Sequence, residues 1–470
     1  MQKSNLVHIL KQFSRRDWRE LGKMVRSSYF NQREDVVRLF SYLEQKMKTA
    51  GSRELEREKV FRFVFKKETF DQQKLRYTTS FLFNIVKRYL IQVELEADKI
   101  QAQQYLYRGM RKKGLEVFFT KELSNTTALL EKGRYRDSHF YLKNYQLGMD
   151  DAISKMPQRR IGAMNFQSIG DFLNISYLSS MLRLSCNIQS HGTISGQVYD
   201  VNLLKEVLSL IQSGQYIDIP AVALYYRCYQ AIEFLKNGDL HHSELNFNEL
   251  KMLINRHWKL FPPSEIRDIY LFTINYCIKR LNAGDKEYIR EAFELFRSGL
   301  ENETLLEEGF ISSFTYKNIT RLGVALKEHQ WVEQFLENYK NYLHPRIKDN
   351  AWRYNLAFFF FQQEKYKSAM QLLVLVEFKD TLNNLDARRM LLKSYFELGE
   401  YDALDSLLDS FSRYINRQKE LGYHKDNYLN LIRFVKKVIH TNEKEKLKEL
   451  KADILNTSAL AEKEWLLEKI

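Results

Sequence analysis

The side chains best suited to metal or thiol chemistry in this sequence are two adjacent histidines and three cysteines. His241 and His242 are the only neighbouring histidine pair. Adjacent residues on a helix point about 100° apart, so these two imidazoles are poorly placed to share a metal ion. Cys186, Cys228 and Cys277 lie far apart and form no C-x-x-C pair. We therefore expect two solvated histidines near a turn and three buried, unreactive thiols.

The motifs that usually carry catalysis are missing from the sequence. It has no G-x-x-x-x-G-K-[ST] loop for phosphates, no G-x-G-x-x-G loop, no G-x-S-x-G nucleophile elbow and no H-E-x-x-H metal motif. Gly192 and Gly196 are an isolated pair with no lysine after them. The sequence predicts a protein that is not an enzyme and needs no cofactor or metal. The remaining catalytic alternative is an atypical site assembled from distant helices.

Positive charge is concentrated in the first third of the chain. Residues 1–160 contain 34 Lys and Arg against 19 Asp and Glu, a net charge of +15, whereas residues 161–470 contain 39 against 40, a net charge of −1. Such an asymmetry indicates a basic part that can meet an acidic partner and a neutral part with another task.

Several basic residues of this third stand beside phenylalanines, a composition that can serve either nucleic acid or an acidic protein. The simpler interpretation is that the phenylalanines form core and the lysines a solvated face. We favour a docking face for an acidic protein and keep direct nucleic-acid binding as the alternative. The candidate residues of this face are Arg62, Lys66, Lys67, Lys87, Arg88, Arg111, Lys112 and Lys113.

The composition predicts long helices. Only 5 prolines and 18 glycines interrupt 470 residues, while 14% of residues are aromatic, which suits large side chains wedged between packed helices. Ser14 with Asp17 predicts a helix start, and residues 82, 85, 86, 89, 90 and 93 are apolar at helical spacing. The segment 189–202 has no helical period and predicts a loop. No signal peptide or membrane span is evident, so we expect a cytoplasmic protein.

A helix-turn-helix pattern recurs from about residue 130. In five segments an aromatic residue or leucine follows a polar turn, and in three of them a small residue comes three positions later. Three of these anchors, Trp331, Tyr366 and Tyr401, stand 35 residues apart. One such unit cannot bury its apolar face alone, so the units are expected to stack.

This pattern resembles the tetratricopeptide repeat, a helix-turn-helix unit of 34 residues. The good matches cover about residues 320–415, and Gln334 and Leu404 depart from the family in replacing the small residue after the turn. The segment SSYFNQREDVVRLF is also similar to uncharacterised helical proteins of Bacteroidota, which implies no activity. The repeat resemblance implies a partner-binding groove lined by Tyr316, Lys327, Tyr354, Phe358, Arg389 and Lys393, suited to an acidic and partly apolar peptide.

Together these patterns predict an all-α, superhelical solenoid of stacked helix-turn-helix repeats with an N-terminal helical bundle. We expect a basic helical domain at 1–125, divergent repeats at 126–215, the repeat array at 216–440 and capping helices at 441–470. The function that follows is a non-catalytic scaffold or adaptor that binds a protein or peptide. The alternative is a nucleic-acid-associated regulator whose repeats serve as a sensing module.

Overall fold

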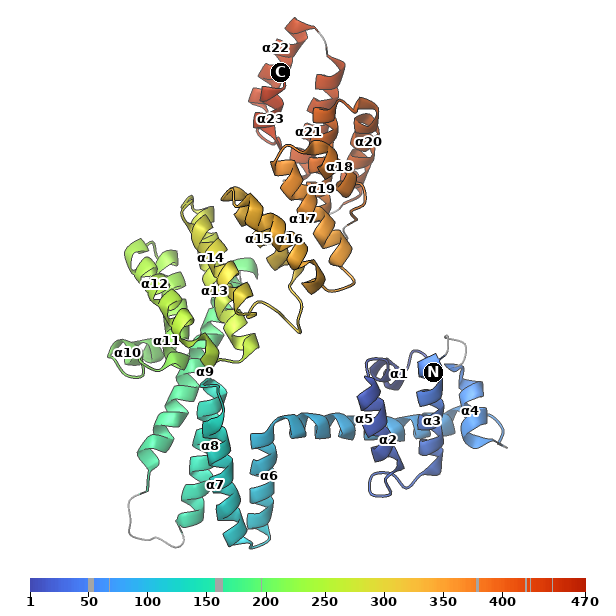
Figure 1. Ribbon diagram of the computed structural model, residues 1–470, viewed down its shortest axis with the longest axis vertical. Helices are drawn as coiled ribbons and strands as arrows, with labels where there is room; N and C mark the ends of the chain where they lie inside the picture. Colours follow the sequence, from blue (N-terminus) through green and yellow to red (C-terminus); the bar gives the residue numbers. More distant parts are fainter. Residues whose placement is uncertain are drawn as a thin grey trace. The chain divides into compact units, whose positions relative to one another are not determined.

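Helices account for all the regular structure in the described part of the chain. The computed structural model describes residues 1–49, 55–66, 68–156, 164–195, 197–377, 380–418, 421–422, 424–441 and 443–470. Within these ranges the chain forms 23 α-helices and no β-strand (Figure 1). The prediction of an all-α protein is confirmed, as the scarcity of helix-breaking residues requires. The superhelical curvature and the four-part domain division stay predictions.

The helices group into two compact units. Unit 1 comprises residues 1–134 and 140–173, and unit 2 comprises residues 135–139 and 174–470. Unit 1 contains α1 (Asn5–Leu10), α2 (Arg15–Arg26), α3 (Glu34–Thr49), α4 (Arg57–Phe65), α5 (Gln72–Ala97), α6 (Lys99–Lys112), α7 (Glu116–Lys132), most of α8 (Ser138–Lys155) and the start of α9 (Phe166–Ser195).

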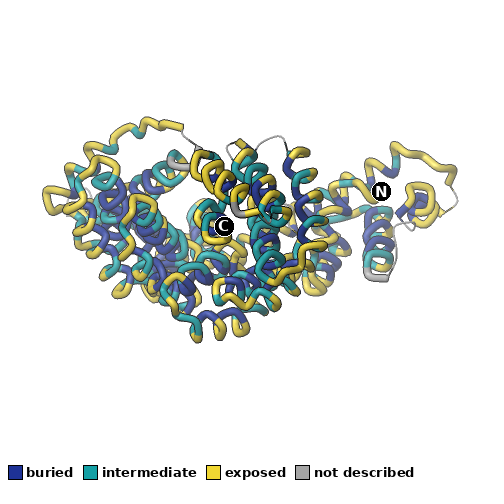
Figure 2. The backbone as a smooth tube through the Cα atoms, turned by 90° about the horizontal axis from the view of Figure 1, so that it is seen from above, coloured by how far each residue is buried: buried dark blue, intermediate teal, exposed yellow. Residues whose placement is uncertain are grey.

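The first five helices share one apolar core, which Figure 2 shows as buried segments facing one another. The helix start predicted at Ser14 is a capping box: Ser14 Oγ accepts the Asp17 N–H at 3.2 Å, and the Asp17 carboxylate accepts the Ser14 N–H at 2.8 Å. Tyr89 on α5 donates its hydroxyl to the same carboxylate at 2.8 Å. This bond holds α5 against the start of α2.

The apolar stripe of α5 is covered for only part of its length. Four residues of the predicted stripe are buried: Leu82, Ile85, Val86 and Tyr89. Leu90 and Val93 continue the same spacing, but each is 39% exposed. Helical spacing identifies which side chains share a face of the helix. The neighbouring helices determine which residues of that face are buried.

Unit 2 is a succession of helices in which each one from α11 onward packs against the next. Its helices after α9 are α10 (Leu204–Gln212), α11 (Pro220–Lys236), α12 (Leu240–His257), α13 (Pro263–Asn282), α14 (Tyr288–Glu301), α15 (Ser313–Ala325), α16 (His329–Asn338), α17 (Lys348–Gln362), α18 (Tyr366–Leu373), α19 (Thr381–Leu398), α20 (Tyr401–Arg417), α21 (His424–His440), α22 (Lys444–Asn456) and α23 (Lys463–Glu468).

The predicted repeat anchors stand where the second helix of a pair begins. Leu240, Tyr366 and Tyr401 are the first residues of α12, α18 and α20. Ser243 and Ala369, the small residues three positions after Leu240 and Tyr366, are fully buried, as expected for close helix contact. Ser243 donates its hydroxyl to the carbonyl of Ala231 on α11 at 2.7 Å. The first helices of successive pairs also touch, α15 with α17 and α17 with α19.

The pair α15 and α16 achieves its close contact through a different residue from the one expected. Gln334 is exposed. The close approach is made by Gly323 on α15, because a methyl group at this position would clash with Cγ2 of Val332 on α16. Trp331 instead stacks on Phe335, with ring centroids 5.4 Å apart. The departure from the family that the sequence shows at Gln334 is therefore accompanied by a small residue on the other helix of this pair.

The loop predicted over 189–202 is partly helical. Helix α9 continues through Ser195, and the described non-helical part begins at Gln197. Gln189 donates its side-chain amide to the carboxylate of Glu233 on α11 at 3.0 Å. Packing against α11 therefore extends a helix whose local composition of Ser, Gly and Thr opposes it, since tertiary contacts override intrinsic propensity. Gly51 and Ser52, expected at a joint between helices, lie outside the described residues.

Candidate partner-binding surfaces

The six residues of the predicted groove fall on or beside α15, α17 and α19, but not all of them face solvent. Tyr316 is completely buried and donates its hydroxyl to the carbonyl of Leu336 on α16 at 2.7 Å. It belongs to the core of its helix pair and cannot contact a partner. Lys327 is exposed in the turn after α15, with a left-handed φ of +60°.

Arg321, on the same helix as Tyr316, links α15 to two other helices. Its guanidinium donates to Tyr354 Oη on α17 at 3.0 Å and to the carboxylate of Asp386 on α19 at 2.6 Å. The guanidinium also lies 5.1 Å from the ring centroid of Phe358. Tyr354 is buried and donates its own hydroxyl to Asp386. The aromatic residues expected to meet a peptide are thus engaged with a cation and a carboxylate of the chain itself.

Arg389 and Lys393 on α19 both bind the carboxylate of Glu462, just before α23. Lys393 donates to it at 2.6 Å, and Arg389 makes a second ion pair with the same group. Arg389 also donates to Asp386 at 2.8 Å. Burial would raise the pKa of Glu462, but the charges of Arg389 and Lys393 outweigh it and hold the pKa below its usual value.

The segment that supplies Glu462 is firmly packed. Trp465 and Leu466 on α23 are buried with residues of α19 to α22, and Trp465 donates its indole N–H to Glu397 on α19 at 2.7 Å. Lys469 donates to the same carboxylate at 2.8 Å. The prediction that Arg389 and Lys393 attract an acidic, partly apolar segment has the right chemistry, but the segment present is the chain's own. These two cations are not open to a partner in this structure.

The candidate basic face is distributed over three helices of unit 1. Arg62 and Lys66 lie on α4 and at its end, Lys87 and Arg88 lie on α5, and the run Arg111 to Lys113 ends α6. Lys67 lies outside the described residues. All the described members are exposed except Arg111, which is partly covered.

The phenylalanines beside these cations divide between core and surface. Phe61, Phe65 and Phe119 are buried, as the simpler interpretation expects. Phe63 and Phe118 are exposed. Phe63 shares a shallow hollow with Arg62 and two lysines, whereas Phe118 lies near the start of α7, where Leu115 and Val117 are also exposed.

Buried contacts between α6, α7 and α8 hold this junction in place. The rings of Tyr107 on α6 and Phe119 on α7 meet edge to face at 5.6 Å. Asp150 on α8 accepts the Tyr107 hydroxyl at 2.7 Å and the Arg108 guanidinium at 2.8 Å. Burial, followed by the Asp150 contact, raises the pKa of Tyr107, so the tyrosine remains a hydrogen-bond donor. Gly114, with φ of +72°, ends α6.

The residues around Gly114 form an exposed surface that is both apolar and basic. We define the α6–α7 tip as Lys112, Lys113, Leu115, Val117 and Phe118. Every residue from 112 to 118 is exposed, and Val117 and Phe118 are 81% and 57% exposed. Neither lysine has an ion-pair partner among the described residues. Solvent-exposed apolar side chains gathered at one place mark interaction surfaces.

Sequence reasoning identified the lysines of this tip but assigned Phe118 to the core together with Phe119. The available signal was the run Val117-Phe118-Phe119. Three consecutive apolar residues on a helix point in three directions about 100° apart, so a single packing neighbour can bury only one or two of them. Phe119 faces α6 and Val117 and Phe118 face solvent.

The described residues show no alternative chemical centre. Nowhere in these ranges do three His, Cys, Asp or Glu side chains converge to hold a metal ion. His241 and His242 are exposed at the start of α12, and His242 Nδ1 lies 2.8 Å from Asp239. The three cysteines are buried and unpaired in disulfides, as predicted.

The helices of the described ranges include none with both the length and the apolarity needed to cross a bilayer. Comparisons of this chain with models of protein families, with curated proteins and with solved structures found no match to any of them.

Proposed function

We propose that this protein is a non-catalytic interaction scaffold that binds an acidic protein partner through the α6–α7 tip. The observation that carries the proposal is the continuous exposure of residues 112–118, where two lysines without ion pairs stand beside Leu115, Val117 and Phe118. The packing of α6 against α7 and α8 fixes this surface on rigid helices. A preorganised surface loses little conformational entropy when it binds.

The charge of the region favours an acidic partner. Residues 99–121 contain six Lys and Arg against a single acidic residue, Glu116. Only Arg108 of these cations is engaged in an ion pair with a carboxylate of α8. Complementary charge steers association and selects partners, while buried apolar and aromatic side chains supply most of the affinity.

The aliphatic part of the tip favours a protein over a nucleic acid. Leu115 and Val117 have no flat face on which a base could stack, whereas they suit the apolar side of an amphipathic helix. Within the repeats, the predicted groove contributes less to the proposal, because Arg389 and Lys393 already hold Glu462. We place the repeats in a supporting role: of the predicted groove residues, Lys327 is exposed and Phe358 is partly exposed, as is the neighbouring Arg321.

The test is a binding titration with a fluorescent, amphipathic, acidic peptide rich in Glu, Leu and Phe. We expect saturable binding that weakens by about tenfold in Phe118→Ser, the usual loss for an aromatic anchor, and by more in Lys112→Glu/Lys113→Glu. The control is Val198→Asp, which alters a more exposed apolar residue in unit 2. Binding unaffected by the tip variants, or reduced equally by the control, contradicts the proposal.

A parallel titration with single-stranded and duplex DNA at two salt concentrations distinguishes this function from the alternative, which is nucleic-acid binding. If DNA binds more tightly than the peptide and its affinity falls steeply with salt, phosphate contacts dominate and the protein is a nucleic-acid binder instead. If DNA binding is weak at both salt concentrations, the acidic-protein proposal gains support.

A further inference from the structure

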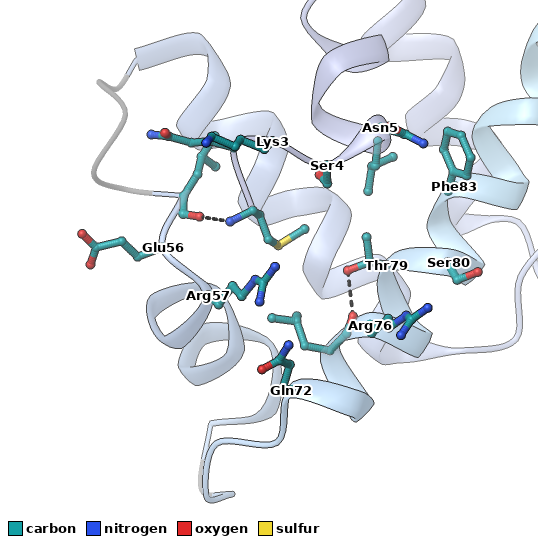
Figure 3. A pocket seen from close by; sticks show the side chains of 15 residues that line it. Lys3, Ser4, Asn5, Glu56, Arg57, Gln72, Arg76, Thr79, Ser80 and Phe83 are labelled. Carbon is teal, nitrogen blue, oxygen red and sulfur yellow. Dashed lines mark hydrogen bonds between the residues drawn. The ribbon is translucent and has the colours of Figure 1, made fainter.

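A cavity of about 740 Å³ opens between the first residues of the chain, the start of α4 and one face of α5 (Figure 3). This volume is typical of sites for small molecules. All the residues that line it belong to unit 1. The cavity lies outside the α6–α7 tip, and the inference drawn from it is independent of the function proposed above.

Two guanidinium groups that have no ion-pair or hydrogen-bond partner among the described residues line this cavity. Arg57 at the start of α4 and Arg76 on α5 approach it from different helices (Figure 3). Neither makes an ion pair or hydrogen bond with any described residue. Glu56 is the only carboxylate in the lining; it points away from the cavity in Figure 3 and lies 3.6 Å from Lys59. Lys3 adds a further cation to the lining.

The N-terminal ammonium increases this excess of positive charge. It donates to the carbonyl of Leu55 at 2.6 Å beside Arg57. Burial, followed by the charge of Arg57, lowers the pKa of this amino group. The cations that line the cavity, Lys3, Arg57 and Arg76, give it the excess of positive charge that suits a bound anion.

The remaining lining divides into apolar and polar parts. Leu6, Leu55 and Leu75 are buried residues whose side chains border the cavity, and Phe83 on α5 adds a partly covered ring. Ser4, Asn5, Gln72 and Ser80 supply polar groups at the rim. A bare inorganic ion would leave the apolar part facing water, so the complementary ligand is an organic anion.

We propose that this cavity binds a small organic molecule that carries a phosphate group, with Arg57 and Arg76 contacting the phosphate and the leucines and Phe83 contacting the remainder. A guanidinium offers a planar fork of N–H donors that matches two phosphate oxygens. Two guanidinium groups from separate helices suit a terminal phosphate, which has three terminal oxygens and two negative charges, better than they suit a single carboxylate.

Isothermal titration of the full chain with AMP, ATP, adenosine and inorganic phosphate tests the proposal. We expect AMP or ATP to bind saturably and more tightly than adenosine or inorganic phosphate. Arg57→Gln and Arg76→Gln should each weaken this binding about tenfold or more, since each removes charge-assisted hydrogen bonds. Arg88→Gln is the matched control, because Arg88 is exposed on α5 and does not line the cavity.

Both arginine variants should melt at the wild-type temperature in phosphate-free buffer, because neither side chain has a partner among the residues that the structure describes. This measurement separates a lost ligand contact from a lost fold. The proposal is overturned if neither nucleotide binds, if adenosine binds as tightly as AMP, if inorganic phosphate binds as tightly as either nucleotide, or if affinity is the same in Arg57→Gln, Arg76→Gln and Arg88→Gln.

Discussion

The ammonium group of Lys393 donates a hydrogen bond of 2.6 Å to the carboxylate of Glu462, 69 residues further along the chain. Arg389, one turn earlier on α19, binds the same carboxylate. Both cations are largely buried. A buried cation without a negatively charged partner would lower the stability of the folded chain. Glu462 thus pairs with both of the residues that the sequence offered as peptide-binding cations, and Asp386 supplies a second negative charge to Arg389.

Replacing this glutamate should destabilise unit 2. Glu462→Gln keeps the shape of the side chain but removes the charge that Arg389 and Lys393 face. We expect the free energy of unfolding at pH 7 to fall by about 1–3 kcal/mol, as is typical for charged hydrogen bonds. Urea unfolding followed by circular dichroism measures the change. Glu464→Gln, an exposed glutamate on α23, is the control and should alter stability little.

The same pair predicts a pH dependence. The pKa of Glu462 in the folded chain lies below its ordinary value of 4.5. Its contribution to stability is therefore complete above the unfolded-state pKa and is lost as pH falls toward the folded-state pKa. The difference in stability between wild type and Glu462→Gln should shrink below about pH 4.5. A difference that stays constant with pH would contradict the assignment of the ion pair.

Glu265 on α13 should behave in the opposite way. Burial is the main cause that raises its pKa above the ordinary value of 4.5, and the nearby Asp137 and Asp268 act in the same direction. Arg183 and Tyr225 lower it but do not outweigh burial. A raised pKa means that stability is complete below the unfolded-state value and is lost as pH rises through the folded-state value.

We therefore expect Glu265→Gln to unfold at pH 7 with at least the stability of the wild type, since the neutral amide removes the cost of a buried charge. Arg183 retains Asp268 as its partner, at 3.0 Å. Urea unfolding of both proteins between pH 4 and pH 8 measures the difference. A marked loss of stability at pH 7 would show that the ionised carboxylate is the stabilising form.

Gly323 on α15 offers a test of helix–helix contact. Gly323→Ala should destabilise the protein by about 1–3 kcal/mol, because the added methyl group meets Val332 and Phe293. Gly109→Ala on α6 is the control: an added methyl group there meets nothing within 4 Å, and alanine favours the helix. Thermal unfolding should therefore shift downward for the first variant and stay level or rise for the second.

The partial cover of α5 gives a paired comparison of two valines. Val86→Ala removes two buried methyl groups and should cost about 1–3 kcal/mol, whereas Val93→Ala, at a position on the same stripe that is partly exposed, should cost less than about 1 kcal/mol. Chemical unfolding of unit 1 in the full chain measures both. Equal losses would mean that another part of the chain covers Val93 in solution.

The fold class and the register of the repeats could be predicted because they depend on local patterns. Sparse proline and glycine required helices, and the residues at 240, 366 and 401 mark helix starts because the turn chemistry just before them is local. The extent of α9 and the exposure of Val93 could not be predicted in the same way. Both depend on which neighbouring helix is present: near the end of α9, for example, Gln189 is bonded to Glu233 on α11.

The binding residues were harder to predict for the same reason. The sequence offered Arg389 and Lys393 as groove residues for a partner peptide, and its spacing could not reveal that Glu462 of the same chain pairs with both. Phe118 was misassigned because its neighbour Phe119 fills the core position. Charge and hydrophobicity identify what a side chain can bind, whereas long-range packing decides whether that capacity is already used.

The positions of the three cysteines allow thiol labelling to measure the opening of unit 2. All three lie in unit 2 and are buried, and burial raises the pKa of the Cys186 thiol, which keeps the reactive thiolate scarce while the unit is closed. Alkylating reagents can therefore modify the chain only as fast as unit 2 opens. The labelling rate therefore measures the opening of unit 2 in the intact protein. Unit 1 has no cysteine among its residues and contributes no signal.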